Sequence, residues 1–341
     1  MEDILTLQKK IIPEMTEILE KRYNILRNIY YNEPIGRRTL AGNLGIGERI
    51  IRTEVNILKK QGLLEIKSVG MNVTEDGKII IDQLKGFIHK LKGLTNLEES
   101  LQQKLKIKKI IIVPGDFDKD NFIKKDVGKT AAEFIKNTIK DNNIIGITGG
   151  STMASVADAM LYNTKLKDIL VLPARGGIGR NVEMQANNIA ARLAKRLDGS
   201  YKLLHVPDNI NKEALNTLLQ VEEIRELVDM LKKMNALIFG IGRADTMAKR
   251  RKLSEELLTD LLNKGAVAEA FGYYFDLNGE IVRESSTVGI TLDDFKKIKT
   301  VIGVACGSEK AKAIKAISSL KKDIVLITDE GAAKEILNMV K

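Results

Sequence analysis

Hydrophobic residues are distributed in two different ways along the 341-residue chain. Up to about residue 106 they recur every three or four positions, which is the helical period. Beyond that point they gather in short runs separated by longer helical stretches, at residues 110–113, 144–147, 169–172, 203–206, 236–239, 300–304 and 324–327. Such alternation of strands and helices predicts a mostly parallel sheet covered by helices on both faces. The chain is therefore predicted to be an α/β protein with a large body at residues 107–341.

The first 74 residues follow the plan of a winged helix-turn-helix domain. Helical spacing predicts helices over residues 3–33, 38–44 and 47–61. Gly45 separates the last two and can adopt the positive φ that ends a helix. Residues 63–74 then alternate weakly, as a short β-wing would. In domains of this plan the second helix of the pair enters the major groove of DNA.

The charge of this region agrees with DNA binding. Residues 35–67 contain seven basic and three acidic side chains, a local net charge of +4. Arg37 and Arg38 stand at the start of the first helix, a position suited to phosphate contacts. Glu48, Arg49 and Arg52 lie at the start and on the exposed face of the second helix, where base edges are reached. The alternative is a helical hairpin used for protein contacts.

Residues 75–106 are predicted to form a helical linker. Leu84, Leu91 and Leu105 are separated by multiples of seven, and a second set of the same spacing contains Phe87, Leu94 and Leu101. Together the two sets describe a coiled-coil seam, although Glu98 interrupts it and Gly86 and Gly93 weaken the helix. Two interpretations stay open: the seam joins two chains in a dimer, or the same face packs onto its own chain.

A candidate phosphate site follows the run at residues 144–147. The sequence Thr148-Gly149-Gly150-Ser151-Thr152 leads directly into a helical pattern of small residues. Two glycines allow backbone N–H groups to turn toward an anion, and a helix N-terminus adds its positive dipole end. A strand, a glycine turn, two hydroxyl groups and a helix start are the parts of a phosphate cradle.

Three further loops at predicted strand ends carry glycines and cations. They are PARGGIGRNVEMQAN with Arg175, Gly176, Gly177, Gly179, Arg180 and Gln185, GIGRADTMAKRRKLS with Arg250, Arg251 and Lys252, and CGSEKAKAI with Lys310. Because parallel sheets bind ligands at the carboxyl ends of their strands, we expect these loops to form one pocket for more than one phosphate. The chain contains no GxxxxGK[ST] motif, which argues against a nucleoside triphosphatase.

These motifs together resemble the SorC/DeoR-type bacterial transcriptional regulators. The segments GRRTLAGNLGIGERIIRTEVNILKKQGLL, GMNVTEDG and ARGGIGRNVEMQAN are similar to the subgroup that controls central glycolytic genes. The resemblance covers nearly the whole chain. It implies a repressor of a glycolytic operon that fructose 1,6-bisphosphate, or a related sugar phosphate, releases from operator DNA. It also implies a doubly wound, Rossmann-like sheet of the sugar-phosphate isomerase and deaminase type, in a homodimer or homotetramer.

The resemblance also implies which residues bind the phosphosugar. One phosphate falls on Gly149, Gly150, Ser151 and Thr152, and the second phosphate and the sugar fall on Arg175, Gly177, Gln185 and Arg250. Glu269 is implied to meet sugar hydroxyls, although many relatives carry aspartate there, and Lys310 to add positive charge. The alternative is a sugar-phosphate isomerase or deaminase with an accessory DNA-binding head. Glu269 is the one carboxylate that the sequence places in the pocket. An isomerase or deaminase needs both a general acid and a general base, so a sugar-phosphate sensor is favoured over an enzyme.

Composition adds a few limits. The formal net charge of +10 suits an anionic partner, although a lysine-rich solvated surface with no such partner would have the same charge. Cys306 is the only cysteine, which excludes an intrachain disulfide and fits a reducing cytoplasm. No apolar run approaches the ~20 residues needed to span a bilayer. We expect a cytoplasmic protein with no metal, no cofactor and no membrane partner.

Overall fold

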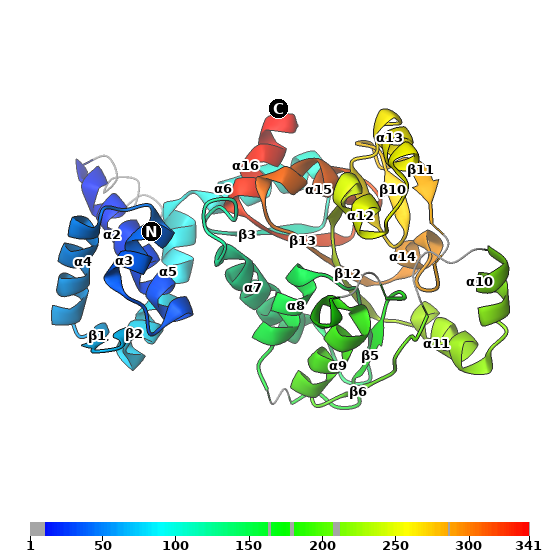
Figure 1. Cartoon of the computed structure of the whole chain (residues 1–341), viewed down its shortest axis with the longest axis horizontal. Coiled ribbons are helices and arrows are strands. Elements are labelled where there is room, and N and C mark those ends of the chain that lie inside the picture. The colour runs from blue at the N-terminus through cyan, green and yellow to red at the C-terminus, as the bar shows by residue number, and fades with distance from the viewer. Residues whose placement is uncertain (1–10, 163–164, 178–180, 207–211, 286, 341) are drawn as a thin grey trace. The chain divides into compact units, whose positions relative to one another are not determined.

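The computed structural model of the chain describes residues 11–162, 165–177, 181–206, 212–285 and 287–340 (Figure 1). The part of the first predicted helix at residues 3–10, and Gly179 and Arg180 of the second glycine loop, lie outside the described residues. The chain divides into two compact units. One contains residues 1–97 and 119–122, and the other contains residues 98–118 and 123–341.

The first unit is a winged helix-turn-helix domain. It contains α2 (Pro13–Asn32), α3 (Arg37–Leu44), α4 (Glu48–Lys60), β1 (Leu64–Lys67), β2 (Gly70–Val73) and α5 (Glu75–Leu91). Gly45 ends α3 with a φ of 63°, and its N–H donates to the carbonyls of Ala41 and Gly42. Strands β1 and β2 pair in an antiparallel hairpin. The predicted helix pair, its glycine turn and the wing are confirmed.

The predicted linker at residues 75–106 is helical, but it is divided into two helices. Helix α5 ends at Leu91, and α6 (Leu94–Leu105) begins after Gly93, which has a φ of 65°. A side chain is strained at this φ, so glycine allows the break between the helices. Of the predicted seam, Leu91 is buried in the core of the first unit, and Leu84 and Phe87 are partly buried against it. This part of the seam packs onto its own chain, and the dimer stays a prediction.

The second unit is built on a seven-stranded parallel sheet, in the order β3-β13-β12-β7-β4-β5-β6. Its strands are β3 (Lys109–Val113), β4 (Ile144–Ile147), β5 (Leu170–Pro173), β6 (Ser200–Tyr201), β7 (Ala236–Gly240), β12 (Thr300–Val304) and β13 (Ile324–Asp329). Helices α7 (Ile123–Thr138), α8 (Ser151–Ala159) and α9 (Ala186–Arg196) pack side by side on one face. Helices α15 (Ala311–Ser318) and α16 (Glu330–Met339) pack together on the opposite side in Figure 1. The predicted α/β fold is confirmed.

A second, antiparallel sheet lies beside the parallel one and was not predicted. Its order is β11-β10-β9-β8, with β8 (Gly242–Arg243), β9 (Ala268–Ala270), β10 (Tyr273–Phe275) and β11 (Ile281–Glu284). The remaining elements are η1 (Val182–Met184), α10 (Lys212–Leu218), α11 (Glu222–Lys232), α12 (Ala244–Arg250), α13 (Glu255–Asn263), α14 (Leu292–Lys297) and η2 (Ser308–Lys310). Strands of two to four residues are too short to show a clear period of two, which explains the omission.

The strand predicted at residues 203–206 is absent. The edge strand β6 lies earlier, at Ser200–Tyr201, where it pairs with β5. The side chain of Asn187 accepts from the Leu204 N–H at 2.9 Å and donates to the Leu204 carbonyl at 3.1 Å. Leu204 is therefore buried without pairing in the sheet. Among the described helices, none is long and apolar enough to cross a membrane.

Candidate functional site

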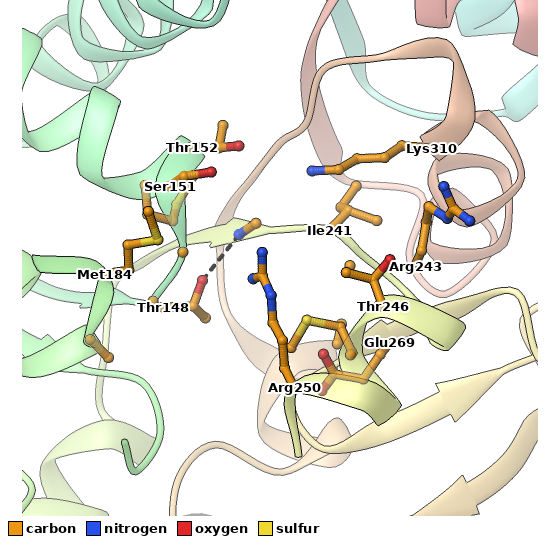
Figure 2. Close-up of a pocket in the computed structure, with 18 of the residues that line it drawn as sticks. Thr148, Ser151, Thr152, Met184, Ile241, Arg243, Thr246, Arg250, Glu269 and Lys310 are labelled. Atoms are coloured by element: carbon orange, nitrogen blue, oxygen red, sulfur yellow. Dashed lines mark hydrogen bonds between the residues drawn. The ribbon is translucent and has the colours of Figure 1, made fainter. Parts of the chain in front are cut away.

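A cavity of about 430 Å³ opens at the carboxyl ends of the parallel strands (Figure 2). It is lined by the loops that follow β4, β5, β7 and β12, and by Glu269 of strand β9. The volume lies in the range of small-molecule sites. The cavity is therefore where the doubly wound sheet is expected to hold a ligand.

The glycine turn after β4 brings the N-terminus of α8 to the cavity. Gly150 has a φ of 115°, a conformation that favours glycine, and no side chain caps the helix that starts at Ser151. Hydrogen bonds fix this loop on both sides. The Gly150 N–H donates to the Met184 carbonyl at 2.9 Å, and Thr148 Oγ1 accepts from the Gly240 N–H at 3.0 Å. The Gly150 N–H is thus engaged within the protein, which leaves the first turn of α8 and its hydroxyls to face a ligand.

The predicted residues Arg175 and Glu269 pair with each other in a buried cluster. Glu269 Oε1 accepts from Arg175 at 2.9 Å, from Arg251 at 2.7 Å and from the Gly272 N–H at 2.9 Å. Arg251 also donates to the Tyr274 hydroxyl at 2.9 Å. All three donors reach Oε1, so among the described residues Oε2 is the carboxylate oxygen left to meet a ligand.

Electrostatics keep Glu269 ionised. Burial alone would raise the pKa of Glu269, but the positive charges of Arg251 and Arg175 outweigh it, and the pKa lies below the ordinary glutamate value. A carboxylate with a lowered pKa is a hydrogen-bond acceptor at neutral pH rather than a proton donor. Glu269 is therefore suited to accept a hydrogen bond from a hydroxyl group.

The cavity is strongly cationic. Its lining includes five positive side chains, namely Lys124, Arg175, Arg243, Arg250 and Lys310, against the carboxylates of Glu269 and Glu309. Both carboxylates are paired with arginines, Glu309 with Arg243 and Glu269 with Arg175 and Arg251. Lys124 was not predicted because only the tertiary structure brings the start of α7 to the cavity, whereas Arg243 lies in the predicted loop GIGRADTMAKRRKLS but was not singled out there.

Three of these cations, Lys124, Arg250 and Lys310, have no carboxylate partner among the described residues. Figure 2 shows the hydroxyls of Ser151 and Thr152 on one side and the amino group of Lys310 on the other, with Arg250 reaching between them from below. Burial lowers the pKa of Lys310, and the nearby charge of Arg250 lowers it further. An anion placed between these groups would relieve their repulsion.

The structure brings together most of the predicted ligand residues. Those that line the cavity are Gly149, Gly150, Ser151, Thr152, Arg175, Arg250, Glu269 and Lys310. Gly177 and Gln185 do not line it. They lie against each other, because a Cβ on Gly177 would stand 2.4 Å from Gln185 Oε1. Among the described residues, no group of three or more acidic, cysteine or histidine side chains is placed to hold a metal ion.

The predicted DNA-contacting side chains lie on α3 and α4 of the first unit. Arg38, Glu48, Arg49 and Arg52 are exposed, and Arg37 is half-buried. Glu54, counted against the basic charge in the sequence, is buried and pairs with Lys21 at 3.1 Å and Arg22 at 2.8 Å. Its negative charge is therefore compensated inside the domain, and the exposed positions of α4 keep their basic character.

A winged helix-turn-helix unit joined to an α/β unit with a cationic cavity defines a DNA-binding transcriptional regulator that responds to a sugar ligand. The family of sugar-binding domains matches residues 89–338, and the family described as the CggR N-terminal DNA binding domain matches residues 18–88. The chain belongs to the family of central glycolytic genes regulators, within the SorC/DeoR-type regulators. This family consists of transcriptional regulators, so the chain is not a sugar-phosphate isomerase or deaminase.

Individual relatives span almost the full chain. The central glycolytic genes regulator of Priestia megaterium (strain DSM 319 / IMG 1521) is 42% identical over 338 residues, covering 99% of each chain. The central glycolytic genes regulator of Bacillus subtilis (strain 168) is 41% identical over 337 residues, again covering 99% of each. The full-length sorbitol operon regulator SorC from Klebsiella pneumoniae has the same fold, with a TM-score of 0.66, 19% identity, and coverage of 96% of this chain and 99% of that one.

Proposed function

We propose that the protein represses a glycolytic operon and is released from operator DNA by fructose 1,6-bisphosphate. The observation that carries the proposal is the cavity itself. The uncapped N-terminus of α8 with its two hydroxyls is faced by Lys310 across the cavity, and Arg250 enters between them from below as a second cationic group. A sugar with two phosphates has the charge to match both, and the named relatives regulate central glycolytic genes.

Each part of the ligand has a counterpart in the cavity. One phosphate is held by the first turn of α8, the hydroxyls of Ser151 and Thr152, and the charge of Lys310. Arg250 holds the second phosphate, and Arg175 lines the same cavity, whereas Gly177 and Gln185 lie against each other outside the lining. Glu269 Oε2 accepts from a sugar hydroxyl. These assignments follow the predicted site, with Arg175 now acting mainly through its bond to Glu269.

The DNA-binding unit completes the regulator. Arg49, Arg52 and Glu48 reach base edges from α4, while Arg37 and Arg38 contact phosphates. A homodimer or homotetramer in the cytoplasm would place two such heads on a two-fold symmetric operator. Effector binding changes operator affinity only by its different affinity for the free and DNA-bound states, typically about 1–3 kcal/mol of coupling.

The test is operator affinity measured by fluorescence anisotropy, with and without fructose 1,6-bisphosphate. Each charge-assisted hydrogen bond to a phosphate contributes about 1.5–3 kcal/mol, so Thr152→Ala should weaken effector binding about tenfold or more. Arg250→Ala should weaken the binding of fructose 1,6-bisphosphate more than the binding of fructose 6-phosphate, because Arg250 contacts only the second phosphate. Both variants should bind operator normally and resist release.

Matched controls come from the same unit. Thr138, whose hydroxyl donates to the Phe134 carbonyl at 2.7 Å, and the exposed Lys249 do not line the cavity. Thr138→Ala and Lys249→Ala should be released at the wild-type effector concentration. Release of Thr152→Ala at that same concentration would show that the glycine turn is structural only. Release of the wild type by another sugar phosphate, and not by fructose 1,6-bisphosphate, would overturn the effector assignment.

A further inference from the structure

Asp329 is a buried carboxylate that connects two walls of the cavity without lining it. It is the last residue of β13 and is wholly buried. Its Oδ1 accepts from the Gly307 N–H and its Oδ2 accepts from the Phe117 N–H, both at 2.9 Å. Phe117, Glu309 and Lys310 do line the cavity. One carboxylate therefore fixes the loop after β3 to the loop after β12.

Asp118 adds a second connection between the same two loops. Its Oδ2 accepts from the Ser308 N–H at 2.9 Å and from the Ser308 hydroxyl. Gly307 has a φ of 100°, and the Lys310 N–H donates back to its carbonyl at 3.1 Å. The turn that carries Lys310 is thus held by Asp329 on its buried side and by Asp118 on its exposed side.

The burial of Asp329 is costly for the fold. Burial raises the pKa of Asp329 above the ordinary aspartate value, even though the N–H groups of Phe117 and Gly307 donate to it. No described lysine or arginine forms an ion pair with it. An apolar residue at this position would avoid the desolvation penalty, so the carboxylate is best explained by what its two oxygens hold.

We propose that Asp329, supported by Asp118, is a positioning residue for the effector site. It holds the two loops so that the amino group of Lys310 faces the first turn of α8 across the cavity. This inference rests on the proposed function, because Lys310 is assigned there to an effector phosphate. Asp329 contacts no ligand atom in this scheme and acts through Lys310.

Two substitutions test the connection from its two sides. In Asp329→Asn one oxygen remains an acceptor, but the amide NH₂ faces the other backbone N–H and cannot accept from it. Asp118→Ala removes the second connection at an exposed position, outside the buried core. Each variant should bind fructose 1,6-bisphosphate about tenfold more weakly by calorimetry, at a temperature well below its unfolding midpoint.

The matched control is Asp276→Ala, which, like Asp118→Ala, removes one carboxylate oxygen that accepts two hydrogen bonds. Asp276 also accepts from two backbone N–H groups, those of Asn278 and Glu280, but in a hairpin turn that does not line the cavity. This control should lower the unfolding temperature and leave the dissociation constant unchanged. If Asp118→Ala and folded Asp329→Asn both bind like the wild type, the inference is wrong.

A double-mutant cycle with Lys310→Ala separates positioning from a general structural effect. If Asp329 acts through Lys310, Asp329→Asn should cost about tenfold in the wild-type background and less than about twofold once Lys310 is absent. The same comparison applies to Asp118→Ala. An equal loss in both backgrounds would overturn the proposal. A wild-type protein that does not bind the bisphosphate would instead contradict the proposed function.

Discussion

Replacing Glu269 by glutamine tests how much the buried cluster of Glu269, Arg175 and Arg251 stabilises the protein. The substitution keeps the shape of the side chain but removes the negative charge that two buried arginines share, Arg175 and Arg251, at 2.9 and 2.7 Å. The Glu269 side chain is 4% exposed, so water cannot replace the lost charge. Breaking a buried ion pair from one side costs about 3–5 kcal/mol. A typical unfolding free energy is about 5–15 kcal/mol, so the loss would be a large share of it.

Urea denaturation at neutral pH measures this loss. Glu269→Gln should lower the unfolding free energy by about 3–5 kcal/mol. The matched control Asp260→Asn breaks an exposed pair with Lys264 one helical turn away and should cost about 0.5 kcal/mol or less. A folded Glu269→Gln protein that loses no more than this control would refute the claim that the cluster stabilises the unit.

The pH dependence of the unfolding free energy tests the direction of the pKa shift of Glu269. Because the pKa of Glu269 is lowered in the folded protein, its stabilisation is present above the ordinary glutamate pKa of about 4.3. The stabilisation is lost as the pH falls through the lowered pKa. The difference in unfolding free energy between wild type and Glu269→Gln should therefore shrink below about pH 4. A difference that grows on acidification would contradict the direction of the shift.

Two further predictions concern the DNA head and the glycine turn. Arg49→Ala or Arg52→Ala should cost about 1–3 kcal/mol in operator binding if the arginine makes a bidentate base contact, whereas loss of a phosphate contact should weaken all sequences and reduce the salt slope. Wild-type affinity in both variants across several salt concentrations would remove α4 from the interface. Gly150→Ala forces a side chain into a φ of 115° and should cost about 1–3 kcal/mol and weaken effector binding, although no atom lies within 4 Å of the new Cβ. Its control, Gly86→Ala inside α5, also meets open space but has helical φ and should stabilise slightly. Equal stability changes in the two glycine variants would argue against strain at Gly150.

Local patterns predicted the elements that the site depends on. The helices around Gly45 and the strands β4, β7 and β12 lie within about one residue of their predicted bounds. Amphipathic period and glycine conformation are properties of a few neighbouring residues, so the sequence carries them directly. The alternation of strands and helices then implies a parallel sheet, and such a sheet brings its carboxyl-end loops to one edge. This is why most of the predicted ligand residues line one cavity.

The partners of those residues were decided by the tertiary structure alone. Glu269 lies on a short antiparallel strand and meets Arg175, 94 positions away, and Asp329 joins two loops 190 residues apart in sequence. The end of α5 before Gly93 and the loss of the strand at residues 203–206 were also decided by the fold. The buried face of α5 packs into the core of the first unit, and the Asn187 side chain, in place of a neighbouring strand, pairs with the Leu204 backbone. The sequence determined which short segments form helices and strands, because that depends on neighbouring residues. It also determined which edge of the parallel sheet holds the cavity, because that follows from the order of these elements. Charge pairing and loop positioning depend on distant contacts, and only the folded chain could settle them.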